Sequence, residues 1–292
     1  MAAILKGYLR LCRPPNLPTA ASNILAGASI VGFFSSSDHP WNILFLVFSS
    51  IFLYAGGVVF NDYFDYELDK KERPERPLPS GLIHPKQAAG FGTVLFLIGV
   101  GLAAASSLFS GSVALLLVFA ILLYDAKTKG HAFFGPLNMG VCRGLNLFLG
   151  MSIFQDFSFW PYTLIPVVFI FAVTLISRGE VHGNNKRNIA FSAFLYAFVL
   201  VSVIILHKAF ELSSYTYLIF LSIFAFMVFK PLYRAYVDNI GKNIMKAVKA
   251  GVLSLILLDA ALASAYADWQ MGVVIVLLLP LSILLAKVFA VT

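Results

Sequence analysis

The sequence has few charged residues and few cysteines. Only 12% of its 292 residues are Asp, Glu, Lys or Arg, whereas soluble domains contain roughly a quarter, so a water-soluble globular domain is excluded. The two cysteines, Cys12 and Cys142, lie far apart in the sequence, which excludes a disulfide framework and a Cys/His zinc site. The N-terminal stretch lacks the apolar core and small-residue cleavage site of a signal peptide, so we expect no cleaved leader.

Hydrophobic residues make up 60% of the chain, in continuous runs without the inside-outside alternation of barrel strands. A membrane-spanning helix needs about 20 apolar residues. Ten such segments are found, at 17–34, 41–61, 88–108, 111–124, 136–154, 160–177, 189–206, 215–230, 247–266 and 271–290. We therefore predict an all-α polytopic membrane bundle of nine to ten transmembrane helices, formed as a single domain over residues 1–292. The 111–124 and 215–230 segments are short for a span.

The distribution of basic residues predicts the topology. All of the 21 Lys and Arg residues except Lys208 and Arg143 lie in or beside the connections that share a side with the N-terminus. By the positive-inside rule, both termini and the polar loops are then cytoplasmic, and we expect the inner membrane of a bacterium. Because the net charge of +7 borders membrane spans, topology and anionic lipid headgroups explain it. We expect the bilayer as a partner and no nucleic acid.

An acid-rich segment, 61–69, follows the second apolar run. Asp62, Asp65 and Asp69 are spaced by three and four residues, so on a helix they share a face. Like charges on one face repel each other, and a cation would relieve that repulsion. Carboxylate and amide oxygens, with Asn61 as a fourth donor, suit Mg²⁺, which often shares its ligand shell with substrate phosphates. A solvated loop is the alternative, but it does not explain acids next to an apolar run.

Arginines follow this segment at helical spacing. Arg73 and Arg76 precede Pro77, and arginine recognises phosphate oxygens with two parallel hydrogen bonds. The run Asn61-Asp62-x-x-Asp65-x-x-x-Asp69-x-x-x-Arg73-x-x-Arg76-Pro77-Leu78-x-x-Gly81 resembles the first aspartate-rich motif of the UbiA superfamily of intramembrane prenyltransferases. The resemblance implies Mg²⁺-dependent transfer of an isoprenoid group from a prenyl diphosphate, with Asp62 and Asp65 as catalytic residues.

Tyr124 and two lysines follow the fourth apolar segment. The resemblance implies a tyrosine and a diphosphate-binding lysine in this loop. Lys129 matches better by its distance from Gly135, and Lys127 stays an alternative. Without the resemblance, these lysines would be interpreted as topology signals.

The fifth segment contains Asn138, Arg143 and Asn146. A charge inside a span costs at least about 2.5 kcal/mol, so Arg143 is expected to face the bundle interior and to meet an anion. That anion is either a bound substrate, with Arg143 and Lys129 as further catalytic residues, or a buried acid, for which Asp259 is a candidate. Arg143 and Asn146 share a helical face. Asn138 and Asn146 have two alternative roles of equal weight, which are binding of substrate and hydrogen bonding between helices.

A third polar cluster lies at 177–186, where the superfamily has a second aspartate-rich motif. Glu180 and Asn184 form a pair of oxygen donors at i, i+4, and we expect them on the side of a second metal or of the diphosphate. Arg178, His182 and Lys186 would share another helical face and contact substrate. His182 could act as a base or bind the acceptor, although a surface histidine is the alternative.

The runs 135–146 and 177–183 together resemble the EboC-like branch of the superfamily. The second motif lacks aspartates and ten segments are present, both of which argue against an aromatic acceptor. We expect a prenyl diphosphate donor and a small acceptor, aromatic or a cyclitol or other polyol, with Mg²⁺ as cofactor. A terpene cyclase of the same superfamily that acts on a prenyl diphosphate alone is one alternative. A non-catalytic lipid-binding or export component is the other.

Overall fold

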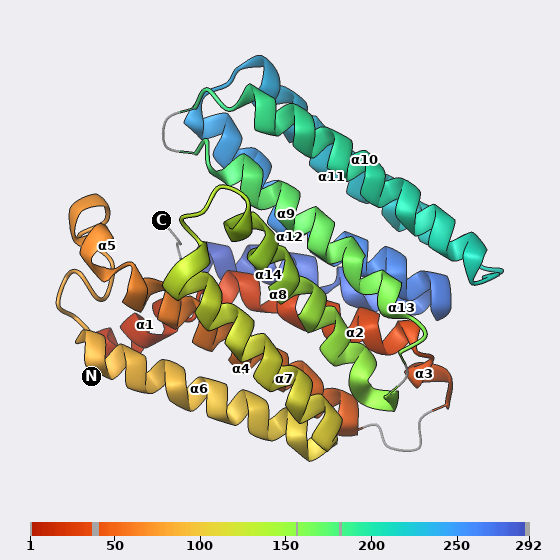
Figure 1. Ribbon diagram of the computed structural model, residues 1–292, viewed down its shortest axis with the longest axis horizontal. Helices are drawn as coiled ribbons and strands as arrows, with labels where there is room; N and C mark the ends of the chain where they lie inside the picture. The colour runs from red at the N-terminus through yellow and green to blue at the C-terminus, as the bar shows by residue number, and fades with distance from the viewer. Residues whose placement is uncertain (1, 37–40, 156, 181–182, 290–292) are drawn as a thin grey trace.

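The computed structural model describes residues 2–36, 41–155, 157–180 and 183–289, which form helices and turns without a strand (Figure 1). The helices, in chain order, are α1 (Ala2–Leu11), η1 (Pro14–Asn16), α2 (Leu17–Ile30), α3 (Phe33–Ser36), α4 (Trp41–Phe64), α5 (Tyr66–Glu72), α6 (Pro85–Ser106), α7 (Leu108–Leu123), η2 (Tyr124–Thr128), α8 (Phe134–Met151), η3 (Ser152–Phe154), η4 (Trp160–Thr163), α9 (Leu164–Ser177), α10 (Lys186–Ala209), α11 (Tyr217–Val237), α12 (Gly241–Tyr266), α13 (Trp269–Val276) and α14 (Leu278–Val288). The predicted all-helical fold is confirmed.

Nine helical stretches within the described residues are long and apolar enough to cross a membrane, so the chain is a multi-span membrane protein. The first predicted segment, 17–34, is the exception, because α2 has 14 residues and a length of about 21 Å. It nevertheless runs from the end that carries both termini and α5 to the opposite end (Figure 1). The lengths predicted for 111–124 and 215–230 are wrong. Polar residues continue these helices to Thr128 and Val237.

Helix α2 lies inside the bundle and contacts α4, α8 and α12. Its approach to α8 requires glycine on both sides. A methyl group at Gly27 would lie 2.4 Å from the carbonyl oxygen of Leu147, and one at Gly150 would lie 2.5 Å from that of Ile24. Small residues permit such close backbone packing between membrane helices. The polar side chains of α2 and α8 are therefore brought together within the membrane.

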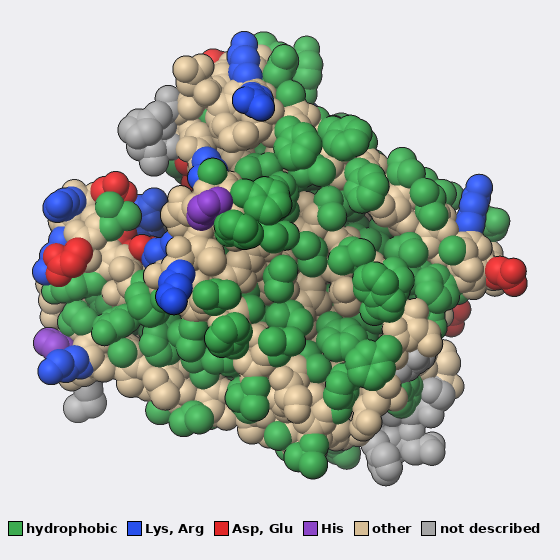
Figure 2. Space-filling model, in the orientation of Figure 1, with side chains coloured by type: hydrophobic (Ala, Val, Ile, Leu, Met, Phe, Trp, Pro, Cys, Tyr) green, Lys and Arg blue, Asp and Glu red, His purple; other side chains and the backbone are tan. Residues whose placement is uncertain are grey.

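The charged segments gather at one end of the bundle. Helix α4 ends at Phe64 and α5 begins at Tyr66, so Asp65 lies at the junction. Helix α6 begins with a capping box, in which the His84 ring accepts from the N–H of Lys86 and the Gln87 side chain accepts from the N–H of His84. Figure 2 shows acidic and basic side chains concentrated at this end, with apolar side chains over most of the remaining visible surface.

Candidate functional site

Asp62 and Asp69 converge on one guanidinium group. Arg76 Nη1 lies 2.7 Å from Asp69 Oδ2 and 3.3 Å from Asp62 Oδ1. Asp62 Oδ1 also lies 2.5 Å from Nη2 of Arg13. Both carboxylates are buried. The repulsion between them is offset by Arg13, from the turn before η1, and by Arg76, from the loop after α5.

Asp65 makes a separate ion pair. Its Oδ1 lies 2.5 Å from Nζ of Lys129, which reaches across from the loop that follows η2. Lys127 is exposed. The structure thus separates the two lysines that the sequence leaves open, and it brings Lys129 to the aspartate segment.

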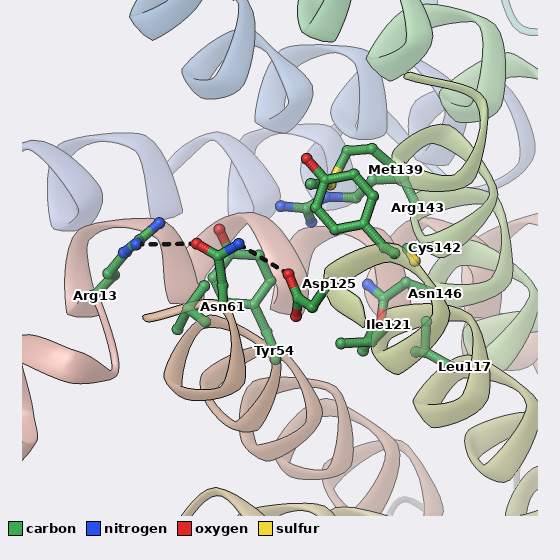
Figure 3. A pocket seen from close by; sticks show the side chains of 13 residues that line it. Arg13, Tyr54, Asn61, Leu117, Ile121, Asp125, Met139, Cys142, Arg143 and Asn146 are labelled. Carbon is green, nitrogen blue, oxygen red and sulfur yellow. Dashed lines mark hydrogen bonds between the residues drawn. The ribbon is translucent and has the colours of Figure 1, made fainter. Parts of the chain in front are cut away.

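Asn61 connects the aspartate segment to η2. Its Nδ2 donates to Asp125 Oδ1 at 2.8 Å, and its Oδ1 accepts from Arg13 at 3.4 Å (Figure 3). Arg13 is held in the left-handed region, with φ of 46°, directly before η1. Burial lowers the pKa of its guanidinium, but the Asp62 carboxylate outweighs this and holds that pKa above its ordinary value. Arg13 therefore stays charged at the centre of the site.

A cavity of about 280 Å³ opens beside this cluster, between α4, α7, η2 and α8 (Figure 3). One part of its wall is apolar and the rest is polar or aromatic. The lining residues are Arg13, Tyr54, Gly57, Val58, Asn61, Leu117, Ile121, Tyr124, Asp125, Met139, Cys142, Arg143 and Asn146. Of the aspartate segment, Asn61 lines the cavity, and the aspartates lie beside it, since Arg13 lines the cavity and contacts Asp62.

Arg143 extends into this cavity from α8. It is only 8% exposed and lies 5.0 Å from the ring centre of Tyr54. Its Nη1 and Nη2 donate to the carbonyl and hydroxyl oxygens of Thr19, at 3.2 and 2.9 Å. Among the described side chains, no carboxylate lies within 4.0 Å of it. Asp259, the candidate acid partner, does not form an ion pair with Arg143, because α2 lies between the two residues.

Asn146 and Asp259 belong to a polar network around α2. Asp259 accepts from Ser22 at 2.5 Å and from Asn23 at 2.6 Å. Asn146 accepts from Ser50 at 2.6 Å, and its amide donates to the oxygen of Asn23 at 3.4 Å. The network between helices that the sequence left open for Asn146 is present, and the same residue also lines the cavity.

Asn138 does not line the cavity. Its amide donates to the hydroxyl of Thr128 at 3.0 Å, which ties α8 to η2. Tyr124, in contrast, lines the cavity. Both residues were predicted to contact substrate. Tyr124 is placed to do so in the cavity, whereas Asn138 holds η2 against α8.

The segment 178–185 is not helical in its described part. The expectation that Glu180 and Asn184 share a helical face is wrong, as is the corresponding expectation for Arg178 and Lys186. Helix α9 ends at Ser177 and α10 begins at Lys186. Gly183 and Asn184 have φ of 66° and 56°, a conformation that breaks a right-handed helix. His182 lies outside the described residues.

The members of this cluster face in different directions. Arg178 donates to the carbonyl oxygen of His131 at 2.5 Å, and Lys186 lies 5.6 Å from the ring centre of Tyr236. Asn184 is exposed, and its N–H donates to the Asn239 carbonyl. Glu180 is half-buried. Its relation to the first motif is electrostatic and runs through Arg73.

The charge of Arg73, in the first motif, affects the pKa of Glu180. Burial raises the pKa of its carboxyl above the ordinary value, and the charges of Arg73 and Lys249 lower it in part. Arg73 is itself exposed. The two predicted motifs are thus linked electrostatically at this end of the bundle.

The acids of the site have the chemistry that Mg²⁺ requires, since carboxylate oxygens are its preferred protein ligands. No group of three His, Cys, Asp or Glu side chains within the described ranges is close enough to hold a metal alone. The carboxylates instead contact Arg13, Arg76 and Lys129. Magnesium usually binds through one or two carboxylates plus substrate phosphates, so the residues present fit a shared metal–diphosphate site.

Two residues of the site were not predicted from the sequence. Arg13 was interpreted as a topology signal, yet it contacts Asp62 and lines the cavity. Asp125 is not among the residues predicted from the sequence, although it is buried and hydrogen-bonded to Asn61. An acid at the end of an apolar run could have identified Asp125 by the rule that identified Asp62. For Arg13, the only local signal is the rigid Pro14-Pro15 pair that follows.

A family model described as the UbiA prenyltransferase family matches residues 19–247. The curated relatives include a digeranylgeranylglyceryl phosphate synthase of Sulfurisphaera tokodaii, 33% identical over 171 residues, which are 59% of this chain and 61% of that protein. Another, of Methanosarcina mazei, is 34% identical over 193 residues, 62% of this chain and 65% of that protein. The matches thus span less than two thirds of these relatives. Both organisms are archaea and neither relative points to the EboC-like branch, so a bacterial inner membrane and that branch gain no support.

Solved structures share the fold. One, from work on digeranylgeranylglyceryl phosphate synthase in membranes, has a TM-score of 0.70 and 22% identity and covers 91% of this chain and 99% of that one. A UbiA homologue from Archaeoglobus fulgidus bound to GPP and Mg²⁺ has a TM-score of 0.62 and 14% identity, and covers 98% of this chain and all of that one. At these identities the likeness concerns the fold alone.

Proposed function

The chain belongs to the UbiA prenyltransferase family, and on this premise we propose that it transfers an isoprenoid group from a prenyl diphosphate to a hydroxyl group of a small polyol acceptor. The observation that carries the proposal is an alternation of acids and bases beside a cavity with an apolar wall, joined to it by Arg13 and Asn61, which line it. Asp62, Asp65 and Asp69 contact Arg13, Arg76 and Lys129 there. Such a site offers ligands to a divalent cation and to a diphosphate at once.

In this proposal the cations of the site hold the diphosphate of the donor. Arg76 and Arg13 present planar guanidinium groups suited to phosphate oxygens, and Lys129 presents a compact charge. Asp62 and Asp65 would hold Mg²⁺, with Asp69, Asn61 and Glu180 as further oxygen donors to complete or orient the site. Bound Mg²⁺ supplies stabilisation of the negative charge that develops on the leaving diphosphate.

The apolar wall of the cavity protects the reacting carbon from water. Gly57, Val58, Leu117 and Ile121 line it. An allylic group that loses diphosphate develops positive charge, and exclusion of water prevents hydrolysis.

An acceptor in addition to the donor is supported by the polar part of the cavity. Arg143 and Asn146 line it at the depth of the spans, where polar groups are costly. A terpene cyclase, which acts on one prenyl diphosphate, would need an apolar surface at this place. The curated relatives are named for a glyceryl phosphate product, which is consistent with a hydroxyl acceptor and favours a polyol over an aromatic compound.

The positive-inside pattern supports a cytoplasmic location of the site. The N- and C-terminal ends of the described chain lie at the end of the bundle that carries α5 (Figure 1). We infer that this end faces the cytoplasm, where soluble diphosphates are available.

Product analysis by mass spectrometry tests the function. The purified protein in detergent is incubated with geranyl, farnesyl or geranylgeranyl diphosphate and Mg²⁺, with and without polyol acceptors. A prenylated polyol and stoichiometric diphosphate are expected only when both substrates are present. A cyclic hydrocarbon from the donor alone would favour the cyclase, and the absence of diphosphate release with every donor would favour the non-catalytic component.

A further inference from the structure

We propose that Arg143 binds an anionic group, a phosphate, on the acceptor, and so selects phosphorylated over unphosphorylated polyols. The inference rests on the proposed prenyl transfer and specifies the chemistry of its second substrate. Two cations line the cavity, Arg13 and Arg143. Arg13 is paired with Asp62 at 2.5 Å, whereas Arg143 has no carboxylate within 4.0 Å among the described residues.

The missing carboxylate partner of Arg143 is energetically costly because the side chain is buried. Arg143 is 92% buried, as its exposed fraction is 8%, and a buried charge without a direct counter-ion is costly. Its two hydrogen bonds to Thr19 use two of the five N–H groups of a guanidinium. The others have no protein acceptor in the described part of the chain. An anion in the cavity would satisfy them.

Asp259, on the other side of α2, is not a direct counter-ion of Arg143. Helix α2 lies between Asp259 and Arg143, and the Asp259 oxygens accept from Ser22 and Asn23. Asp259 therefore makes no contact with Arg143 and leaves its cavity-facing donors free.

The position of Arg143 separates its ligand from the donor diphosphate. Along α4, Tyr54, which the Arg143 guanidinium faces, precedes Asn61 by seven residues, or about 10 Å along a helix. The donor diphosphate, bound at Asp62 and Asp65, would lie beside the cavity. A second anion further inside belongs to the other substrate. Asn146, one turn from Arg143 and also in the wall, can bind a hydroxyl of the same molecule.

The volume limits what can enter. About 280 Å³ is at the lower end of ligand pockets, which span about 300–1,000 Å³. It suits the reacting end of the donor and a small headgroup, but not two isoprenoid chains. The phosphate could belong to a soluble polyol phosphate or to the headgroup of a lipid whose chain stays in the bilayer, and the experiment distinguishes these sources.

The first experiment measures acceptor preference with geranylgeranyl diphosphate and Mg²⁺. Its soluble arm compares glycerol phosphate with glycerol, and its lipid arm compares geranylgeranylglyceryl phosphate with geranylgeranylglycerol. We expect the unaltered protein to prefer the phosphorylated member of one arm by at least about 10-fold in kcat/KM, because hydrogen bonds between charged groups are strong. Arg143→Gln should abolish this preference and leave the KM for the donor unchanged, and Arg143→Lys should keep part of it.

A matched variant separates binding from support of the fold. Thr19→Val removes the hydroxyl that Arg143 contacts but keeps the guanidinium, so the preference for phosphate should persist. If Thr19→Val removes the preference as fully as Arg143→Gln does, the role of Arg143 is structural and the inference is wrong. Retention of the preference in Arg143→Gln, or a rise in the donor KM that matches the loss with acceptor, would also overturn it.

A binding measurement avoids dependence on turnover. The donor site is first filled with Mg²⁺ and a non-hydrolysable thio analogue of geranylgeranyl diphosphate, and the melting temperature is then measured with each compound. A ligand that binds the folded state raises that temperature. A phosphorylated compound should do so in the unaltered protein but not in Arg143→Gln. Equal effects in both proteins, or none from any phosphorylated compound, would contradict the inference. Failure of the proposed function is a different result, the absence of prenyl transfer and diphosphate release.

Discussion

Arg13 and Asp62, which are 49 positions apart in the sequence, form an ion pair of 2.5 Å beside the cavity. The pair joins the turn before α2 to the end of α4. It also places a cation that lines the cavity against the first acid of the aspartate segment. The N-terminal segment is thus part of the site and not only a topology signal.

Replacement of Arg13 by glutamine should therefore impair prenyl transfer. Loss of a hydrogen bond between charged groups costs about 1.5–3 kcal/mol, or about 10- to 100-fold, and we expect a fall of that size in kcat/KM for the donor. Arg10→Gln is the matched control, because Arg10 is exposed in the same segment and its loss should change kcat/KM by less than about 2-fold. Equal effects of the two variants in a diphosphate-release assay would contradict this role.

The two lysines after α7 should differ in the same way. Lys129 contacts Asp65 at 2.5 Å, whereas Lys127 is exposed. Lys129→Gln is expected to lower kcat/KM for the prenyl diphosphate by at least about 10-fold, and Lys127→Gln should leave it nearly unchanged. The measurement is steady-state kinetics over a range of donor concentrations. A larger loss in Lys127→Gln would show that the other lysine holds the diphosphate.

The sequence predicted those parts of the site that depend on local spacing. Asp62, Asp65 and Lys129 were identified because acids near an apolar run and a recurring motif are visible in one stretch of chain. The contacts of Arg13 depend on tertiary packing, since 49 residues separate it from Asp62. No local pattern encodes that distance.

The fold could be predicted more fully than the second motif. Membrane spans follow from apolar length alone, so the helical bundle was predictable. The segment 178–185 was misinterpreted as helical, because the i, i+4 spacing of Glu180 and Asn184 outweighed the turn signal of Gly183, Asn184 and Asn185. The positive φ angles at Gly183 and Asn184 are incompatible with a right-handed helix.

Glu180 should affect the Mg²⁺ requirement more than the fold. It is half-buried and interacts with Arg73 of the first motif. If it supports the metal–diphosphate site, Glu180→Gln should raise the Mg²⁺ concentration for half-maximal activity several-fold. Glu72→Gln is the control, since Glu72 is exposed near the same end. Unchanged Mg²⁺ dependence in Glu180→Gln would remove Glu180 from the site.

Cys12 should react slowly with thiol reagents at neutral pH. Burial raises the pKa of its thiol to about 11, and the thiolate is the reactive form. In a Cys142→Ser background, the rate of alkylation by iodoacetamide should still rise about tenfold per pH unit between pH 8 and 10. A plateau near pH 8.5, the ordinary value, would contradict the burial.

The same shift has a consequence for stability. Because the pKa of the folded state is raised, the stability that the half-buried neutral thiol contributes is present below about pH 8.5 and is lost as the pH rises through about 11. Cys12→Ala should reduce this alkaline loss. Melting temperatures at pH 8 and pH 11 in detergent measure it, and an identical decrease in both proteins would contradict the assignment.

The central claim is that the aspartate segment holds Mg²⁺ and a prenyl diphosphate for transfer, and diphosphate release measures it most directly. The unaltered protein, Asp62→Ala, Asp65→Ala and the exposed-site control Glu67→Gln are each incubated with prenyl diphosphate and acceptor, with Mg²⁺ or with EDTA. We predict Mg²⁺-dependent release from the unaltered protein and from Glu67→Gln, and none above background from either aspartate variant. Full activity in Asp62→Ala or Asp65→Ala would contradict the account.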